Sequence, residues 1–409
     1  MTEPVTSPPL ALGLAEIQAA REVLRGVSVE TPMERSRWLS ALCGGPVHLK
    51  CENLQRTGSF KARGAYYRMA RLTEAERANG VVAASAGNHA QGVALAGQLL
   101  GIHATVFMPE GAPIPKERAT RGYGADVVFE GRYIEDALVG ARRFAEETGA
   151  VLIHPFDHAD IMAGQGTCGL EVAEQAPEAR TVLVPTGGGG LIAGVAIALK
   201  ALRPDVHLVG VQAEGAAAYP TSLEQGAPVA LTSMRTMADG IAVGMPGELT
   251  FAAVRDLVDE VVTVSEDSMS RALVALVERT KTIVEPAGAA AVAALLDHPD
   301  RWSTPLVAVL SGGNIDPLLL GKVIRHGMAA AGRYHAMRVN IPDVTGGLAG
   351  LLLEVSDAGA NVLEVVHERT SPTLHVGEVE VLLQLETRGQ DHSERLLARL
   401  RERGYRVTG

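Results

Sequence analysis

Residues 181–202 read TVLVPTGGGGLIAGVAIALKAL, which is a strand pattern, four successive glycines and a helix pattern in one stretch. The β-branched run before Pro185 predicts a buried strand, and the Ala/Leu-rich run after Gly190 predicts a buried helix. Glycines at such a junction form a loop whose backbone N–H groups can surround an anion at the helix N-terminus. This unit is typical of open α/β sheets, which bind ligands beyond the carboxyl ends of their strands.

The same alternation of strand and helix patterns continues on both sides of this stretch. The further strand candidates are VHLK near 47, VVAAS near 81, ATVFMP near 104, DVVFE near 126, VLIHP near 151, VHLVGVQ near 206, VVTVS near 261 and LVAVL near 306. Strands that are separated by helices predict parallel sheets with crossover connections. Their number favours two α/β domains over one.

The pattern changes after about residue 325. Residues 335–341 (HAMRVNI) alternate like a half-buried antiparallel strand, and a helix, two strands, a helix and a short strand follow them. The order βαββαβ is that of ferredoxin-like domains. We therefore predict a small separate domain over residues 334–409.

Composition narrows the classes of function. The 409 residues are 47% hydrophobic and 21% charged, as in a folded globular chain, and the net charge of −10 argues against nucleic acid as a partner. Three cysteines without metal-ligand spacing suit a reducing compartment. The first residues lack the features of a secretion signal, and glycines interrupt the longest uncharged run. We expect a cytoplasmic protein with no membrane span.

Lys61 stands in residues 52–64, ENLQRTGSFKARG, where Ser59 is the predicted N-cap of the following helix. A lysine in the first turn is a poor structural cation, because the helix N-terminus carries partial positive charge. That field, together with desolvation, lowers the pKa of the ammonium group and frees an amine nucleophile, as Schiff-base chemistry requires. An ordinary solvated lysine is the alternative.

Residues 85–92, SAGNHAQG, follow another predicted strand and precede a helix. The small residues Ser85 and Gly87, at a helix N-terminus, predict a backbone cup for a carboxylate or a phosphate. Asn88 could donate a hydrogen bond to a phenolate or carbonyl oxygen. A polar helix cap without a ligand is the alternative.

The loop Gly187–Gly190 lacks the Lys and Ser/Thr that follow in a nucleoside-triphosphate loop. Glu214, at the end of the next strand, leaves a dinucleotide site as a competing interpretation. The segments SGGN at 311–314 and EPAG at 285–288 also begin after strands or before helices, and each is a weak signal by itself.

Taken together and in this order, SFKARGA, SAGNHAQG, PTGGGGL, EPAGA and SGGN resemble the fold-type II pyridoxal-phosphate enzymes, most closely the threonine/serine dehydratases, also called threonine ammonia-lyases. The likeness covers roughly residues 10–325. It implies an α/β catalytic region over residues 1–325, with parallel twisted sheets flanked by helices. A smaller subdomain at about 50–150 would be inserted between two parts of a larger one, at about 13–49 and 151–325.

The resemblance also implies a cofactor, pyridoxal 5'-phosphate, and a small amino-acid substrate. Lys61 would hold the cofactor covalently and, once released by the substrate amine, would remove the α-proton. The residues implied to bind the cofactor are Phe60, Lys61, Asn88, Gly187, Gly188, Gly189, Gly190, Leu191, Gly240 and Ser311. Those implied to lie near the substrate carboxylate are Ser85, Gly87 and Asn88.

Ser311 would face the pyridine nitrogen of the cofactor. A neutral serine cannot keep this nitrogen protonated as a carboxylate would, so the α-carbanion is less stabilised and loss of a β-leaving group competes with reprotonation. The implied reaction is β-elimination, which converts L-threonine to 2-oxobutanoate and ammonia, and L-serine to pyruvate.

Two positions depart from related enzymes. Serine racemases have a serine where this chain has Ala86, so racemisation is expected to be poor. A divalent-cation site in some relatives uses a Glu and a second acid six residues later, but here Glu214 is followed at that distance by Pro220. No divalent metal site is predicted, and a monovalent cation is the alternative.

Residues from about Tyr334 onward resemble an ACT domain, a small fold that binds amino acids at subunit interfaces. The resemblance implies a regulatory ligand, such as isoleucine, near Gly347, Leu348 and Asn361, and a homo-oligomer (dimer or tetramer). A dimerisation module without a ligand is the alternative.

Other functions remain open. An NAD-dependent dehydrogenase would use the glycine loop and Glu214 but would leave Lys61 without a role. An amino-acid-sensing protein with a vestigial catalytic fold conflicts with the intact Lys61, Asn88 and Ser311. A serine racemase or a β-replacement synthase of the same fold are further alternatives.

Overall fold

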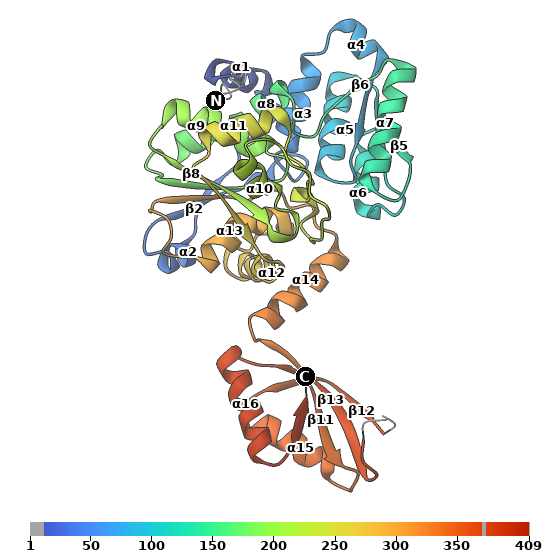
Figure 1. The fold of residues 1–409 in the computed structure, drawn as a ribbon, viewed down its shortest axis with the longest axis vertical. Coiled ribbons are helices and arrows are strands. Elements are labelled where there is room, and N and C mark those ends of the chain that lie inside the picture. The colour runs from blue at the N-terminus through green and yellow to red at the C-terminus, as the bar shows by residue number, and fades with distance from the viewer. Residues whose placement is uncertain (1–11, 370–373, 409) are drawn as a thin grey trace. The chain divides into compact units, whose positions relative to one another are not determined.

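The computed structural model describes residues 12–369 and 374–408, and the chain divides into two compact units between Leu320 and Gly321 (Figure 1). The division falls inside helix α14 (Pro317–Ala330). The predicted α/β class is confirmed for the first unit, which contains two separate sheets flanked by helices. The domain boundaries predicted near residues 50, 150, 325 and 334 stay predictions.

The larger sheet of the first unit has six strands in the order β1-β2-β10-β7-β8-β9. All of its neighbours are parallel except β1, which pairs with β2 in the antiparallel direction. The short edge strand β1 was not predicted, because its sequence MER has two charged residues and no β-branched one. The strands are β1 (Met33–Arg35), β2 (Val47–Lys50), β7 (Thr181–Pro185), β8 (His207–Ala213), β9 (Glu260–Val264) and β10 (Leu306–Val309).

The smaller sheet has four parallel strands in the order β5-β4-β3-β6. Its strands are β3 (Val81–Ala84), β4 (Ala104–Met108), β5 (Asp126–Phe129) and β6 (Val151–Leu152). Each predicted strand of the first unit is therefore present. The chain builds this sheet between β2 and β7 of the larger sheet, and so visits the larger sheet twice.

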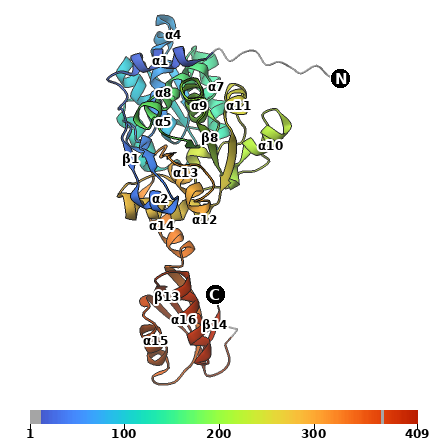
Figure 2. The same ribbon diagram turned by 90° about the vertical axis from the view of Figure 1, so that its left-hand side faces the viewer.

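Helices cover both faces of the larger sheet. Figures 1 and 2 show α1, α8, α9 and α11 on one side of it and α2, α12 and α13 on the other. The helices of the first unit before α14 are α1 (Leu14–Leu24), α2 (Arg37–Leu42), α3 (Lys61–Ala70), α4 (Glu74–Asn79), α5 (Asn88–Leu100), α6 (Ile114–Gly122), α7 (Ile134–Thr148), α8 (Ala159–Gln175), α9 (Gly190–Leu202), α10 (Ala218–Gln225), α11 (Glu248–Leu257), α12 (Glu266–Ala275) and α13 (Pro286–Asp297).

Close approach of α8 to its neighbours depends on small residues. A Cβ placed on Gly194 of α9 would lie 2.3 Å from the carbonyl oxygen of Met162, and one on Gly164 would lie 2.6 Å from Cα of Gly64 in α3. Contacts this short exclude any side chain. Helix α8 therefore packs directly against the helix that begins at Lys61.

The second unit has the predicted ferredoxin-like order. Its antiparallel sheet runs β12-β13-β11-β14, and Leu351, Val355, Leu396 and Leu400 of its two helices pack into one core with the sheet. Its elements after α14 are β11 (Tyr334–Pro342), α15 (Gly347–Asp357), β12 (Asn361–Glu368), β13 (Glu378–Glu386), α16 (Gln390–Glu402) and β14 (Arg406–Thr408).

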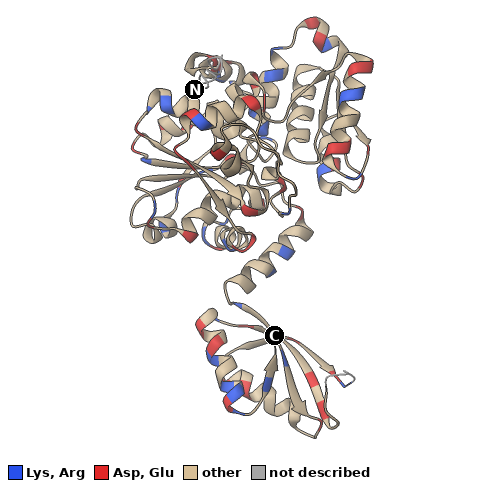
Figure 3. Cartoon of the chain, viewed as in Figure 1, with Lys and Arg blue, Asp and Glu red and all other residues tan. Residues whose placement is uncertain are grey.

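Charged residues of both signs are interspersed over the elements of each unit (Figure 3). Within residues 12–369 and 374–408, no helix is both long and apolar enough to cross a bilayer.

Candidate active site

A cavity of about 450 Å³ in the first unit brings together residues from motifs far apart in the sequence. Its wall contains these residues predicted from the sequence: Phe60, Lys61, Ser85, Gly87, Asn88, Gly240 and Ser311. It also contains four charged residues to which the sequence analysis gave no role: Lys116, Glu135, Asp239 and Glu285. The cavity is the candidate active site.

Lys61 is the first residue of α3, as the helix pattern predicts, but Ser59 is not its N-cap. The residue at the N-cap position is Phe60, and the Ser59 hydroxyl has no hydrogen-bond partner. Ser59 instead forms an antiparallel bridge with Gly312, and the Phe60 N–H donates to the carbonyl of Ser311 at 3.2 Å. The prediction of a capping serine was wrong because a long-range backbone pairing holds this turn. That pairing also brings Ser311 beside Lys61.

The side chain of Lys61 is held inside the cavity wall. Its Nζ donates a hydrogen bond to the carbonyl of Pro155 at 2.8 Å. Burial lowers the pKa of Lys61 to about 8, although the nearby Glu285 carboxyl acts in the opposite direction. A lysine with this pKa is partly uncharged near neutral pH, and the uncharged amine is the form that attacks an aldehyde.

Asn88 and Glu285 form a polar pair on the cavity wall. The Nδ2 of Asn88, at the start of α5, donates to Oε1 of Glu285 at 2.6 Å, and Oδ1 of Asn88 accepts from Asn314 at 2.8 Å. Burial, with Asp239 nearby, raises the pKa of Glu285 to about 7. Its other oxygen, Oε2, is buried without a partner. Sequence reasoning missed this residue, since an acid before Pro286 is also an ordinary way to begin a helix.

The loop Gly187–Gly190 lies next to the cavity but does not line it. A Cβ on Gly188 would come within 2.5 Å of the Phe156 ring, and one on Gly187 within 3.2 Å of Val243. Phe156 and Val243 in turn line the cavity. Gly189 has a φ of 97°, which a side chain would strain. The loop is thus a tight backbone turn that only glycine can form.

Hydroxyl groups from α10 and α11 fix the orientation of this loop. The carbonyl of Gly188 accepts from Thr250 Oγ1 at 2.6 Å and from the Tyr219 hydroxyl at 3.3 Å. Asp157 accepts from the first N–H groups of α11, including that of Thr250. Leu191, also predicted as a cofactor residue, is buried in the core of the larger sheet.

These features fit pyridoxal phosphate. Lys61 supplies a buried amine of lowered basicity, and the glycine loop at the N-terminus of α9 supplies backbone N–H groups without side chains, as phosphate binding requires. Asn88 presents an amide on the same wall, and Phe60 and Gly240 can cover two faces of a flat ring. Ser311 is the predicted partner of the ring nitrogen and also lines the cavity.

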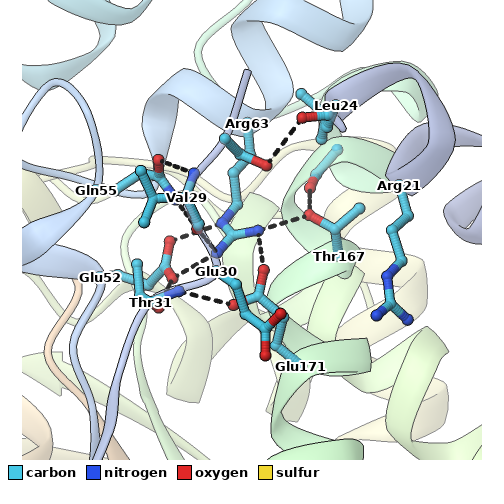
Figure 4. A network of polar contacts seen from close by, with 12 residues as sticks. Arg21, Leu24, Val29, Glu30, Thr31, Glu52, Gln55, Arg63, Thr167 and Glu171 are labelled. Atoms are coloured by element: carbon cyan, nitrogen blue, oxygen red, sulfur yellow. Dashed lines mark hydrogen bonds and ion pairs between the residues drawn. The ribbon is translucent and has the colours of Figure 1, made fainter. Parts of the chain in front are cut away.

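A second cluster of buried charge surrounds Arg63, two residues after Lys61 on α3. Figure 4 shows the Arg63 guanidinium between Glu52, Thr167 and Glu171. Its Nε and Nη2 each donate to Glu52 at 2.8 Å, and Nη1 donates to Glu171 at 2.6 Å. Lys50 is the second cation, paired with Glu171 and with the carbonyl of Thr31 at 2.8 Å. Burial would raise the pKa of Glu52, but the Arg63 guanidinium outweighs it and holds that pKa below its usual value.

The regulatory residues predicted in the second unit are only partly together. Leu348 lines a cavity of about 370 Å³ with Asp343, Gly346 and Arg369. Gly347 begins α15 beside it, whereas Asn361 begins β12 and donates to Glu386 at 3.3 Å without lining the cavity.

The described residues contain no group of His, Cys, Asp and Glu side chains placed to hold a metal ion. Glu214, considered above for a cation or a dinucleotide, lies in a 3₁₀ turn after β8 and does not line the cavity.

Comparison with known proteins gives the family. The sequence pattern of the family described as "Pyridoxal-phosphate dependent enzyme" matches residues 25–312. An L-threonine ammonia-lyase from Geobacter sulfurreducens is 47% identical over 392 residues, which are 96% of this chain and 98% of the relative. This chain belongs to the pyridoxal-phosphate-dependent enzymes, and its nearly full-length likeness to an ammonia-lyase includes the C-terminal unit.

Solved structures agree with this assignment. A threonine deaminase from Solanum lycopersicum superposes with a TM-score of 0.73 at 40% identity, over 76% of this chain and 92% of that one. A maize serine racemase has the same TM-score at 37% identity, over 76% of this chain and 96% of that one. The fold and the pyridoxal-phosphate dependence predicted from the motifs are confirmed.

Proposed function

We propose that this enzyme converts L-threonine to 2-oxobutanoate and ammonia, and L-serine to pyruvate and ammonia. The observation that carries the proposal is the buried, weakly basic Lys61 amine in a small cavity, in a chain similar over nearly its whole length to a threonine ammonia-lyase. A cavity of about 450 Å³ suits a small amino acid beside a cofactor better than a large substrate.

The bound cofactor supplies the electron-withdrawing ring that makes the α-proton of the substrate acidic. Lys61 holds the cofactor and, once its Nζ is free, accepts the α-proton, because burial keeps this amine partly neutral. Asn88 would hold the ring oxygen of the cofactor and Ser311 its ring nitrogen. Phe60 and Gly240 would cover the two faces of the ring.

Three further interactions complete the proposed site. The glycine loop Gly187–Gly190 and Leu191 at the start of α9 bind the phosphate group through backbone N–H groups. Ser85 and Gly87 bind the substrate at its carboxylate. The neutral Ser311 favours loss of the β-hydroxyl over reprotonation of the α-carbon, which gives elimination its advantage.

The test is the appearance of 2-oxobutanoate when L-threonine is added to the enzyme loaded with pyridoxal phosphate. We expect turnover of threonine and of serine, and a bound cofactor that absorbs near the visible edge. Release of no 2-oxo acid from either amino acid by the loaded enzyme would contradict the proposal.

Racemisation is the second candidate, because a serine racemase is one of the similar structures. Ala86 counts against it, since a methyl group cannot exchange a proton with the opposite face of the α-carbon. We expect D-serine to form from L-serine far more slowly than pyruvate. D-serine that accumulates as fast as pyruvate would favour the racemase.

For the second unit we propose regulation of threonine turnover by a branched-chain amino acid such as isoleucine, bound near Gly347, Leu348 and Asn361. The cavity that Leu348 lines together with the apolar Leu352 and Val379 and the cationic Arg369 supports this proposal. We expect isoleucine to change the threonine saturation curve of the full chain but not of a chain that ends before Tyr334. An equal response of both chains would exclude it. We also propose a cytoplasmic homo-oligomer, a dimer or a tetramer.

A further inference from the structure

Lys116 is a buried cation in the cavity wall. It lies in the first turn of α6 and only 8% of it is exposed. Its ammonium pairs across the cavity with Asp239, whose side chain is 55% exposed. Helix α6 connects β4 and β5 of the smaller sheet, whereas Asp239 belongs to a 3₁₀ turn between α10 and α11 of the larger one. The ion pair therefore joins opposite walls of the site.

The ionisable residues of the described cavity wall include more acids than cationic residues. Of the described residues that line the cavity, Lys61 and Lys116 are cationic, and Glu135, Asp239 and Glu285 are acidic. The amine of Lys61 is engaged by the cofactor. An amino-acid substrate adds a carboxylate, and a carboxylate that leaves water is stabilised more strongly by a charged hydrogen-bond donor than by a neutral one. Among the described residues of this wall, Lys116 is the remaining cation.

The position of Lys116 suits this role. A Cβ placed on Gly87 would lie 3.9 Å from the Nζ of Lys116, so the ammonium lies against the segment predicted to bind the carboxylate. Helix α5 begins directly after Gly87, and the N–H groups of its first turn have no acceptor inside the helix. An ammonium group has three donors, and the ion pair with Asp239 leaves others for a second carboxylate.

We propose that Lys116 binds the α-carboxylate of the substrate and that Asp239 holds its ammonium in the cavity until the substrate arrives. This inference rests on the proposed function in requiring an amino-acid substrate. It makes Lys116 the residue that selects a free carboxylate over an amide or ester. The competing explanation is a purely structural strap, in which the ion pair only ties the two walls together.

The experiment compares L-alanine with L-alaninamide, which differ in the carboxylate and carry no leaving group. Binding of each to the holoenzyme is followed by the change in cofactor absorbance. We expect the wild type to prefer alanine by at least about tenfold, as a charge-assisted pair in a buried site does. Lys116→Met should lose this preference, and Lys116→Arg should restore part of it. Retention of the full preference by Lys116→Met would overturn the proposal.

Arg118→Met is the matched control, because Arg118 is exposed on the same helix and does not line the cavity. It removes one positive charge and should leave the alanine preference unchanged. Cofactor content, read from the same spectra, should be equal in the wild type, Lys116→Met and Arg118→Met. A loss of preference in Arg118→Met equal to that in Lys116→Met would reduce the effect to general electrostatics and contradict the assignment.

Asp239→Asn distinguishes the two explanations of the ion pair, a carboxylate site at Lys116 and a purely structural strap. If Lys116 serves the substrate, removal of its competitor leaves alanine binding as tight as in the wild type or tighter. If the ion pair is a strap, Asp239→Asn and Lys116→Met weaken binding equally, which would refute the inference.

Threonine turnover, measured in parallel, distinguishes failure of this inference from failure of the proposed function. If the wild type releases no 2-oxo acid but its binding of alanine depends on Lys116, the proposed reaction is contradicted and the carboxylate site is supported. If the wild type turns over threonine and Lys116→Met has the same KM for threonine, the proposed reaction is supported and the carboxylate site is contradicted.

Discussion

Two clusters of buried charge lie at the start of the same helix, and they differ in how completely their groups are paired. Arg63 has two acidic partners and makes a bidentate contact with Glu52. Lys61, two residues earlier, has one carbonyl partner, and the nearby Glu285 has an oxygen with none. The Arg63 cluster has the pairing expected of a structural element. The Lys61 cluster keeps groups with shifted pKa values that can take new partners, as a catalytic site requires.

The largest expected effect is on turnover, after a change in the incompletely paired Lys61 cluster. Lys61→Ala should reduce 2-oxobutanoate release from threonine by at least about 10⁴-fold, because it removes both the attachment point and the base. The measurement is steady-state turnover with excess pyridoxal phosphate. Lys322→Ala, a change at an exposed lysine of α14, is the control and should retain normal turnover. Substantial turnover by Lys61→Ala would show that catalysis does not need this amine.

A change in the Arg63 cluster, whose groups are paired, is expected to lower the free energy of unfolding. Arg63→Met leaves the Glu52 and Glu171 carboxylates buried, with Lys50 still paired with Glu171, and loss of one member of a buried ion pair costs about 3–5 kcal/mol. Urea unfolding of the protein measures the change. Arg25→Met breaks an exposed pair with Glu22 and should cost at most about 1 kcal/mol. Equal losses of unfolding free energy in Arg63→Met and Arg25→Met would mean that the buried ion pairs contribute no more to stability than an exposed one.

Glu285 predicts a pH dependence of stability in the protein without cofactor. The pKa of Glu285 is about 7 in the folded protein and ordinarily 4.5. As the pH rises, the unfolded chain therefore loses this proton at a lower pH than the folded protein does. Its contribution to stability is full below pH 4.5, is lost as pH rises to about 7, and amounts to about 3 kcal/mol. Relative to Glu285→Gln, the wild type should therefore lose stability between these pH values.

The matched control for this comparison is Glu224→Gln, at an exposed acid of α10. Differences between proteins are compared because burial lowers the pKa of His89 from 6.5 to about 3, and its contribution to stability changes in the opposite direction over an overlapping pH range. A difference between wild type and Glu285→Gln that stays constant with pH would mean that Glu285 ionises normally.

The smallest expected effect concerns Ala86. Ala86→Ser introduces a hydroxyl group into the cavity wall beside Gly87 and Asn88. We expect D-serine formation from L-serine to rise above the wild-type level while pyruvate remains the main product. The measurement is chiral chromatography of the reaction mixture. An unchanged D-serine level would show that this one position does not control racemisation.

The strands of the first unit could be predicted from sequence because β-branched runs and glycine junctions are local signals. The glycine motifs also located most of the site, since the carboxyl ends of the strands and the following helices meet there. Ser59 was wrongly predicted as a cap because its backbone is paired with Gly312, more than two hundred residues away. No local pattern contains such a pairing.

Lys116 and Glu285 show the other limit of sequence reasoning. Lys116 lies in PIPKERATRG, a polar helix pattern that resembles any solvated surface, yet the ammonium is buried. Its importance comes from Asp239, which only the packing of α6 against the other wall brings near. Glu285 similarly acquires its raised pKa from burial and from Asp239, which neither its position before a proline nor its neighbours in sequence could indicate.

The most direct test of the account is to reduce the enzyme loaded with pyridoxal phosphate with borohydride and to map the labelled peptide by mass spectrometry. The account predicts one labelled residue, Lys61, in the peptide that contains SFKAR, and no label at Lys50 or Lys116. Prior addition of L-threonine should reduce this labelling, because the substrate amine displaces Lys61. Label at another lysine, or none in an enzyme that turns over threonine, would contradict the account.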